Sequence, residues 1–212
     1  MNILILGATG RTGRLVAQAA MAGKHQVTAI IRDHAKTAIP GVVYLVGSLT
    51  DEQLLNRALK GIDAVVISLN INRTSDNPFA KVISPLTLIS DSVKALIPAM
   101  EQNGVKRIIT VSASGVGDSW TDMIFVARWL IRCSNIWKAY EDHDRQERLI
   151  RKSNLDWTIV RPVMLNDKDT DVYYVSTGKP TGSAISRKGV AKFILDVLES
   201  GKYTREVVTI NG

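Results

Sequence analysis

The chain of 212 residues is 45% hydrophobic and 22% charged, which is the composition of one ordinary globular domain and excludes a disordered or repetitive chain. Its 27 lysines and arginines outnumber its 20 aspartates and glutamates, so the surface favours anionic ligands. The basic residues are scattered and do not form an arm with interleaved aromatics, and we therefore do not expect nucleic acid as a partner.

Metal, disulfide and membrane sites are not expected. Cys133 is the only cysteine, so no internal disulfide or cysteine-based zinc site can form. The longest apolar stretch, residues 123–133, contains Arg128 and Arg132 and is shorter than the roughly 20 residues that a membrane span needs. The first residues lack the basic stretch, apolar core and cleavage site of a leader, and we expect a cytoplasmic protein.

Short apolar runs rich in β-branched residues alternate with longer helical patterns along the chain. The predicted strands are residues 2–6, 26–31, 42–46, 64–69, 107–111, 157–160 and 206–210. The predicted helices are residues 12–22, 51–60, 85–103, about 123–153 and 187–200. Glycine ends every helical pattern except the fourth, as is common at helix C-termini, and Pro98 predicts a kink or a break in the third.

This alternation of buried strands and helices predicts an α/β fold. Strands that are apolar on both faces indicate a parallel sheet covered by helices on each side. We therefore expect a single Rossmann-like domain over residues 1–212, with a doubly wound parallel sheet of about seven strands. In such folds ligands bind beyond the carboxyl ends of the strands, and we expect small elements within about residues 112–185 to cover a substrate there.

The loop after the first strand reads GATGRTG, with glycine at positions 7, 10 and 13. A sharp turn into a helix whose free backbone N–H groups face an anion requires residues without side chains at the closest approach. The spacing differs from the standard G-x-G-x-x-G, but its place after a strand and before a helix indicates a site for a dinucleotide pyrophosphate. The alternative is a glycine turn that holds no ligand.

The end of the second strand indicates which dinucleotide is bound. An acidic residue here would accept hydrogen bonds from the adenosine ribose and disfavour a 2′-phosphate, but this chain has Arg32, with Lys36 one helical turn further on. A guanidinium can hold a phosphate through two hydrogen bonds, so we expect NADP(H) to be preferred over NAD(H). Asp33 leaves an alternative open, since it could turn toward the ribose or begin the next turn.

Four segments together resemble a known family: GATGRTG, IIRDHAK, TVSASG after the fifth strand, and SNLDWTIVRP. The chain resembles the atypical short-chain dehydrogenases/reductases, and within them the NmrA-like, NAD(P)H-binding group that includes biliverdin-IXβ/flavin reductase and bacterial putative NADH-flavin reductases. The resemblance implies that residues of the loop contact the pyrophosphate, namely Gly7, Ala8, Thr9, Gly10, Arg11, Thr12 and Gly13. It also implies that Arg32 meets the adenosine ribose or its phosphate.

The same resemblance assigns the rest of the cofactor site. It places Ser48 and Leu49 beside the adenine, although the family usually has aspartate where this chain has Ser48. It places Ser68, Leu69 and Asn70 along the central ribose, and Ser112 to Ser114 beside the nicotinamide. Relatives that reduce biliverdin have a histidine where this chain has Met164, which argues against a bilin-specific site.

The usual catalytic pair of short-chain dehydrogenases is missing. That chemistry needs a tyrosine followed four residues later by a lysine, and no tyrosine of this chain has that partner. Hydride transfer to a planar conjugated acceptor such as a flavin or quinone makes a lighter demand, because the negative charge is delocalised and the cofactor and acceptor need mainly to be stacked. We expect such a small planar substrate and a monomer or homodimer.

Candidate catalytic side chains follow the fifth strand and lie in the fourth helical pattern. Ser112 and Ser114 are candidates by position, and Tyr140, His143 and Glu147 share a helix face on which Glu147 could raise the pKa of His143. The alternative is a solvated face whose histidine does nothing. Arg161 is expected to brace the site by ion pairing. Trp120, Trp129 and Trp137 could form an apolar platform over the cofactor, or be core or dimer-interface residues.

Three functions follow from these features, in decreasing order of support. The first is an NAD(P)H-dependent reductase of a planar acceptor. The second is a regulator of the NmrA type that binds NADP(H) without turnover and senses redox state. The third is a sugar-nucleotide epimerase or dehydratase. It has the least support, because this chain lacks both the tyrosine–lysine pair and the additional C-terminal length of a substrate domain.

Overall fold

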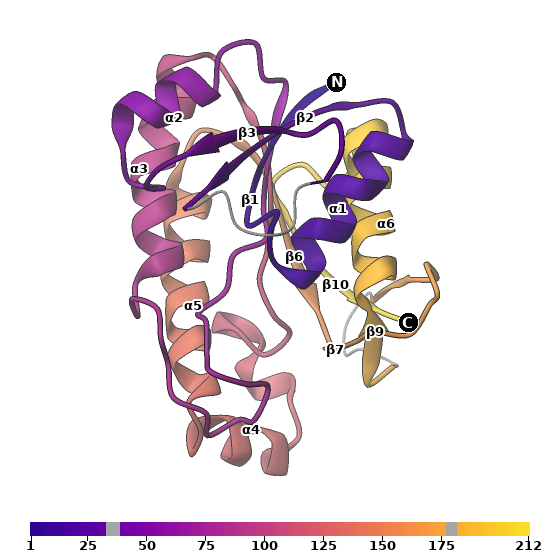
Figure 1. Ribbon diagram of the computed structural model, residues 1–212. Coiled ribbons are helices and arrows are strands. Elements are labelled where there is room, and N and C mark those ends of the chain that lie inside the picture. Colours follow the sequence, from indigo (N-terminus) through magenta and orange to yellow (C-terminus); the bar gives the residue numbers. More distant parts are fainter. Residues whose placement is uncertain (33–38, 177–181) are drawn as a thin grey trace.

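A computed structural model describes residues 1–32, 39–176 and 182–212 of the chain, and within them eight strands form one sheet and two short strands form a separate pair (Figure 1). The strand order is β3-β2-β1-β4-β5-β6-β10-β8. In this order, neighbouring strands are parallel from β3 at one edge as far as β10. The last strand, β8, is antiparallel to β10. The strands are β1 (Asn2–Leu6), β2 (Gln26–Ile31), β3 (Val43–Val46), β4 (Ala64–Ile67), β5 (Arg107–Val111), β6 (Asp156–Pro162), β8 (Tyr174–Ser176) and β10 (Glu206–Asn211).

Helices cover both faces of this sheet, which confirms the predicted doubly wound fold. The helices are α1 (Arg11–Ala22), α2 (Glu52–Ala58), α3 (Leu88–Gln102), α4 (Phe125–Arg132), α5 (Ile136–Lys152) and α6 (Arg187–Ser200). Figure 1 shows α1 and α6 side by side on one face and α2, α3 and α5 on the other.

Two apolar cores separate the helices from the sheet, and the strand pattern explains both. Because side chains alternate between the two faces of a strand, Ile3 and Ile5 of β1 pack toward α1 and α6, whereas Leu4 and Leu6 pack toward α2 and α3. All four side chains have no exposed surface. The apolar run from Ile3 to Leu6 is thus buried on both faces, as expected for a strand in the interior of a parallel sheet.

A kink or a break was predicted at the proline of the third helical pattern, and the helix is not broken there. Helix α3 runs through Pro98 without interruption. Proline removes the N–H that would bond the carbonyl of Lys94, and both Pro98 and Lys94 lie on the exposed side of the helix. Because the freed carbonyl faces solvent, the helix can keep its path.

The fourth pattern, predicted as one long segment, forms two helices, α4 and α5. Between them Ser134 donates to the carbonyl of Ile131 and accepts from the N–H of Ile136. The amide of Asn135 donates to the carbonyls of Phe79 and Ala80. Serine and asparagine side chains compete in this way with helical backbone bonds, and they turn the chain between the two helices.

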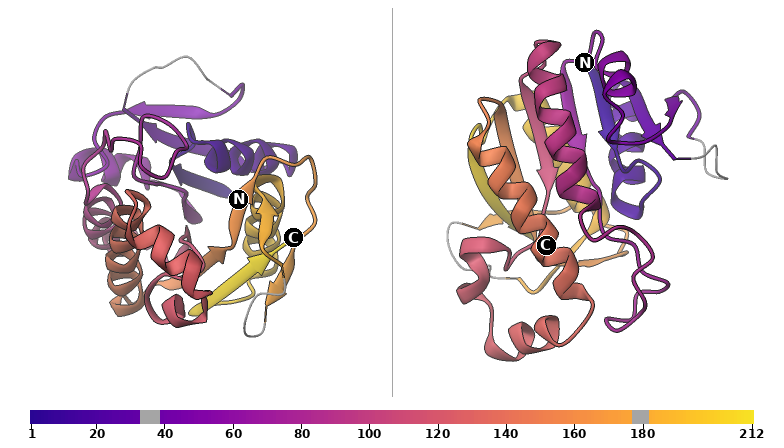
Figure 2. Two further views of the ribbon diagram at one scale, coloured as in Figure 1. Left: turned by 90° about the horizontal axis from the view of Figure 1, so that it is seen from below. Right: turned by 90° about the vertical axis from the view of Figure 1, so that its left-hand side faces the viewer.

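The strand order reverses between β1 and β4, because β2 and β3 are added on one side of this pair and β5, β6 and β10 on the other. Further elements lie beyond the carboxyl ends of the strands, at the lower end of the molecule in Figure 1. They include a short 3-10 helix, η1 (Gly117–Asp122), helix α4 and the parallel pair β7 (Met164–Asn166) and β9 (Ala184–Ser186). Figure 2 shows α4 projecting from the body of the molecule. Ligands of such folds bind at this reversal.

Candidate functional site

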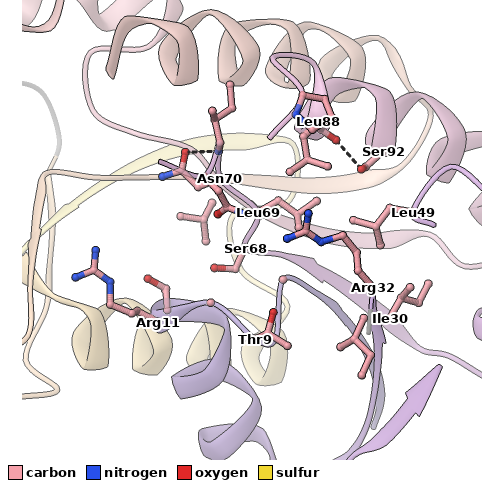
Figure 3. Close-up of a pocket in the computed structure, with 18 of the residues that line it drawn as sticks. Thr9, Arg11, Ile30, Arg32, Leu49, Ser68, Leu69, Asn70, Leu88 and Ser92 are labelled. Carbon is pink, nitrogen blue, oxygen red and sulfur yellow. Dashed lines mark hydrogen bonds between the residues drawn. The ribbon is translucent and has the colours of Figure 1, made fainter. Parts of the chain in front are cut away.

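A cavity of about 1070 Å³ opens at the carboxyl ends of β1, β2, β4 and β5 (Figure 3). Of the residues predicted to lie beside the cofactor, Ala8, Gly13, Ala113 and Ser114 do not line this cavity, and the others do. They are Gly7, Thr9, Gly10, Arg11, Thr12, Arg32, Ser48, Leu49, Ser68, Leu69, Asn70 and Ser112. Segments far apart in the sequence thus meet around one space.

The glycine loop joins β1 to α1 at close quarters. A Cβ on Gly7 would lie 2.3 Å from the backbone oxygen of Ser68, and a Cβ on Gly13 would lie 2.2 Å from the backbone oxygen of Gly7. Gly7 also has a φ of 90°, which favours glycine. These two glycines are therefore required by contacts between backbone segments of the protein itself, which differs from the expectation that all three clear space for a ligand.

The first turn of α1 faces the cavity with unpaired backbone donors. Gly10 is the N-cap and has no side chain to accept from the N–H groups of the helix, and the first turn carries no acidic residue. The N–H groups of Arg11 and Thr12 have no helical partner at this position, and both residues line the cavity. Such a helix terminus favours an anion.

A second donor without an acceptor lies in the same cavity wall. Nη1 of Arg73 is buried and, among the residues that the structure describes, has no hydrogen-bond partner. Arg73 lines the cavity from the loop between β4 and α3. A buried guanidinium N–H without an acceptor is costly, and the positive charge of Arg73 favours an anion in the cavity that this residue lines. The cavity therefore fits a phosphorylated group.

Arg32 extends from the end of β2 into the cavity (Figure 3). Ser48 and Leu49 line the same end. Asp33 and Lys36, the other residues considered for this end of the site, lie outside the described residues.

The side chain of Arg11 is held by carboxylates. It makes two hydrogen bonds to Asp76, at 2.7 and 3.0 Å, and its Nη1 lies 3.5 Å from Asp167. Arg187, at the start of α6, pairs with the other oxygen of Asp167 at 2.6 Å. The backbone of Arg11 is thus available to a ligand, while its side chain links three segments around the cavity.

At the other end of the cavity, Ser112 connects to a buried ion pair. Its hydroxyl donates to Oε1 of Glu147 at 2.7 Å. Glu147 accepts two further bonds from Arg161, from Nε at 2.9 Å and from Nη2 at 2.6 Å. All three side chains are buried, and Arg161 also pairs with Asp118. The predicted bracing role of Arg161 agrees with this geometry.

His143 lines the cavity beside Ser112 and is buried, so the alternative of a solvated helix face is wrong. Its Nδ1 lies 3.0 Å from Oε1 of Gln146, and Nε2 of Gln146 donates to the hydroxyl of Thr110. Because the amide oxygen can only accept, this arrangement assigns the proton to Nδ1 and leaves Nε2 as an acceptor.

The carboxylate of Glu147 acts to raise the pKa of His143, as predicted, but the net shift of that pKa is downward. Burial lowers the pKa of His143, and this outweighs the opposing effects of the Gln146 hydrogen bond and of the Glu147 and Asp142 carboxylates. Desolvation disfavours the charged imidazolium. His143 is therefore a neutral imidazole near pH 7.

Tyr140 and Ser114 are not brought to this cavity. The hydroxyl of Tyr140 donates to the backbone oxygen of Ser114 at 3.0 Å, and burial raises the pKa of Tyr140 to about 12. Tyr140 lines a separate cavity of about 670 Å³ instead. A phenol held in this way is poorly suited to donate a proton to a substrate in the first cavity.

The predicted tryptophan platform is also not formed over the first cavity. Trp120 and Trp137 pack edge to face, with ring centroids 5.1 Å apart, and line the second cavity with Tyr140. Trp129 lies on α4 and is 57% exposed. The positions of the three tryptophans in the sequence suggested a common surface, but they do not reveal which cavity each side chain faces.

Sequence reasoning missed Arg73, Asp76 and Arg187, all of which line the cavity. Asp76 meets Arg11 across 65 positions of sequence, and no local pattern signals such a pairing. The available signal was positional, because the loop after β4 lies at the carboxyl edge of the sheet, where ligands bind.

Fold and cavity together define a dinucleotide-binding α/β protein. The family model described as NAD(P)H-binding matches residues 7–201, and the chain belongs to this family, whose members are atypical short-chain dehydrogenases/reductases. A curated relative, the UPF0659 protein YMR090W of Saccharomyces cerevisiae, is 27% identical over 93% of this chain and 87% of its own length. The predicted family is thus confirmed.

Two solved structures share the fold over the whole chain. One is ChuY, described as an anaerobillin reductase, from Escherichia coli O157:H7, with a TM-score of 0.81, 21% identity and 97% of that chain covered. The other is a short-chain dehydrogenase/reductase from Veillonella parvula in complex with NADP, with a TM-score of 0.80, 19% identity and 94% of that chain covered. At these identities the likeness concerns the fold.

Two properties of the described residues bear on membrane and metal partners. No helix among them is both long and apolar enough to cross a membrane. Likewise, residues 1–32, 39–176 and 182–212 contain no group of three or more histidine, cysteine, aspartate or glutamate side chains able to hold a metal ion.

Proposed function

We propose that the protein is an NADPH-dependent reductase that transfers a hydride to a planar conjugated acceptor such as a flavin or quinone. The observation that carries this proposal is the cavity itself, which has Arg32 at one end, the N-terminus of α1 along its side, and Ser112 and His143 at the other end. A dinucleotide laid along the carboxyl edge of the sheet would span these groups in that order.

The described residues have separate roles in this proposal. Backbone N–H groups at the start of α1 would bind the pyrophosphate, and Arg32 would bind the 2′-phosphate. Ser48 and Leu49 would contact the adenine, and Ser68, Leu69 and Asn70 the central ribose. Nε2 of His143 would accept a hydrogen bond from the nicotinamide half. NADPH, when bound, supplies the hydride.

Neither Ser112 nor His143, at this end of the cavity, is placed to donate a proton to a substrate, and this favours a conjugated acceptor. The hydroxyl of Ser112 already donates its hydrogen bond to Glu147. His143 is neutral, and its one N–H group points toward Gln146. Such a site can stack an acceptor on the cofactor. Hydride transfer leaves a delocalised negative charge on the reduced acceptor, which then takes a proton from solvent. Ser114 and Tyr140 have no contact with the reacting groups in this proposal.

An acceptor screen tests the reductase. Purified protein is mixed with NADPH and, separately, with FMN, a quinone, a redox dye or biliverdin, and NADPH absorbance is followed. We expect oxidation with at least one planar acceptor, and faster oxidation with NADPH than with NADH. Trp120→Phe, in the second cavity, serves as a control that keeps activity. If the protein binds NADPH tightly and none of the acceptors accelerates NADPH oxidation, the proposal is contradicted.

A second candidate is the NADP(H)-binding redox sensor, and the neutral hydrogen-bonded His143 favours it because a sensor needs no acid. This function requires different affinities for the two redox states of the cofactor. Calorimetric titration with NADP⁺ and with NADPH separates the two candidates. A sensor shows a large difference between the two dissociation constants and no turnover, whereas the reductase shows turnover.

A further inference from the structure

Two buried carboxylates lie close to His143 on helix α5, and in the described part of the chain neither forms a hydrogen bond with its imidazole. Asp142 accepts instead from the first turn of α3, at the backbone N–H of Ile89 and the hydroxyl of Ser90. The two oxygens of Glu147 are engaged by the serine hydroxyl and the guanidinium described above. The position of the imidazole proton is therefore not fixed by a carboxylate.

Gln146 connects His143 to strand β5. Its side chain has no exposed surface. Its Nε2 donates to the hydroxyl oxygen of Thr110 in β5 at 2.5 Å, so its Oε1 faces Nδ1 of His143 at 3.0 Å. A buried amide that is held at both ends cannot turn without leaving polar atoms unpaired, which is costly. Its oxygen holds the proton on Nδ1 of His143 and, being uncharged, stabilises an imidazolium less than a carboxylate would.

The other ring nitrogen of His143, Nε2, is open to the cofactor cavity that this residue lines. Among the described residues, the one hydrogen bond of the His143 ring is made by Nδ1. The fully buried side-chain atoms without a partner, within the same residues, are nitrogens of Arg73, Arg107 and Arg128. Nε2 of His143 is not one of them and thus keeps surface that a ligand can reach. An unprotonated ring nitrogen can pair only with an N–H or O–H group.

We propose that Gln146 is a positioning residue for the cofactor, which holds His143 as the Nδ1–H tautomer so that its Nε2 accepts a hydrogen bond from the nicotinamide half. The inference rests on the proposed binding of NADPH in the first cavity but not on turnover. The nicotinamide half offers two kinds of donor, the ribose hydroxyls and the carboxamide N–H groups. The opposite tautomer would present an N–H to these donors, so Gln146 decides whether this wall of the cavity accepts or donates.

The tautomer is measured in the protein without cofactor. The chain has three histidines, so a long-range ¹H–¹⁵N correlation spectrum contains three imidazoles, and His143→Gln identifies the signals of His143. Near pH 7 we expect Nδ1 to be protonated and Nε2 to be unprotonated. A ring that is protonated on Nε2, or on both nitrogens, would overturn the proposal. This measurement uses the wild-type protein and does not depend on whether any variant folds.

Gln146→Met tests the positioning role, because it keeps the length of the side chain and removes both polar groups. We expect the Nε2–H tautomer of His143 to appear and the Kd for NADPH to rise about tenfold, as for the loss of one hydrogen bond to a buried partner. Leu149→Ala is the matched control, since Leu149 packs in the core under α5 and lines neither cavity. The control should lose stability but keep the tautomer and the Kd. Equal Kd values in Gln146→Met and wild type would contradict the proposal, as would a control that binds as weakly as Gln146→Met.

Cofactor titrations followed in the same spectrum identify the donor. We expect NADPH to shift the Nε2 resonance of His143, because this atom accepts a new hydrogen bond. The 3-acetylpyridine analogue of the cofactor lacks the carboxamide N–H groups and keeps the ribose hydroxyls. A shift that persists with the analogue assigns the donor to the ribose, and a shift that is lost assigns it to the carboxamide. NADPH that fails to bind, or that binds without moving this resonance, would overturn the proposal. A protein that shows the shift but reduces no acceptor contradicts the reductase and leaves the role of Gln146 in place.

Discussion

Arg32 is the residue that would distinguish the two nicotinamide cofactors, because only NADPH carries a 2′-phosphate for its guanidinium. We predict that Arg32→Ala lowers the ratio of NADPH to NADH affinity about tenfold, the size of one charge-assisted hydrogen bond. Fluorescence titration with each cofactor measures this ratio. Arg57→Ala, which removes the same charge from the exposed side of α2, should leave the ratio unchanged. An unchanged ratio in Arg32→Ala would remove Arg32 from phosphate recognition.

His143 makes the stability of the protein depend on pH. Burial lowers the pKa of His143 in the folded state, whereas in the unfolded chain a histidine has a pKa of about 6.5. The unfolded chain then binds a proton that the folded protein does not, so the free energy of unfolding falls as the pH drops through about 6.5. We predict that His143→Gln loses less stability than wild type between pH 8 and pH 5.5. Urea unfolding at the two pH values measures this, and equal losses would contradict it.

The sequence predicted single site residues where a local pattern carries the chemistry. The glycine loop and Arg32 are of this kind, because a turn or a strand end fixes their place in a parallel sheet. Tyr140 and His143 were predicted to share a face, and only His143 reaches the cofactor cavity. Which flank of α5 faces that cavity depends on packing against β5 and β6, and this information is not local.

At the level of elements, the junction of β1 and α1 depends on Gly13. A methyl group there would lie 2.2 Å from the carbonyl oxygen of Gly7, so strand and helix would have to separate. We predict that Gly13→Ala destabilises the protein by about 3 kcal/mol, measured as a shift of the urea midpoint. Gly61→Ala is the control, since its Cβ would meet nothing within 4 Å and only its φ of 69° adds about 1–2 kcal/mol. Equal costs would contradict this reasoning.

The buried pair of Glu147 and Arg161 connects α5 to β6, and through Ser112 to the end of β5. We predict that Glu147→Leu and Arg161→Met each cost about 3 kcal/mol, because each leaves the other charge buried with only a partly exposed partner, Asp118 for Arg161 and Arg151 for Glu147. The double variant should cost clearly less than the sum of the two. Urea unfolding of the four proteins measures this cycle, and simple additivity would show that the pair is not coupled.

The elements that the sequence predicted well are those whose limits are set by local chemistry. Strand β1 is apolar from Ile3 to Leu6, and helix α6 ends at Gly201, which has a positive φ. The predicted segment 123–153 failed because its apolar periodicity continues through the turn at Ser134 and Asn135, where side-chain bonds to the backbone end α4. The short strands β7, β8 and β9 were missed because three residues carry too little periodicity to be recognised.

At the scale of the whole molecule, one line of charges joins segments on opposite sides of the cofactor cavity. Asp76 in the loop before α3 pairs with Arg11 at the start of α1, Arg11 approaches Asp167 after β7, and Asp167 pairs with Arg187 of α6. The side chains of Arg11, Asp76 and Asp167 are more than half exposed. Each exposed pair contributes only about 0–1 kcal/mol, so this connection can open without unfolding the sheet.

We predict that this connection slows the release of bound NADPH. Asp76→Asn removes the bidentate pairing with Arg11 and should raise the dissociation rate constant about two- to fivefold, which corresponds to the energy of one exposed pair. Raising the ionic strength should accelerate release from wild type more than from Asp76→Asn, because salt screens exposed charges. Stopped-flow displacement of NADPH by excess NADP⁺ measures both rates. Identical rates and identical salt dependence in the two proteins would mean that the loop carrying Asp76 does not control access to the cavity.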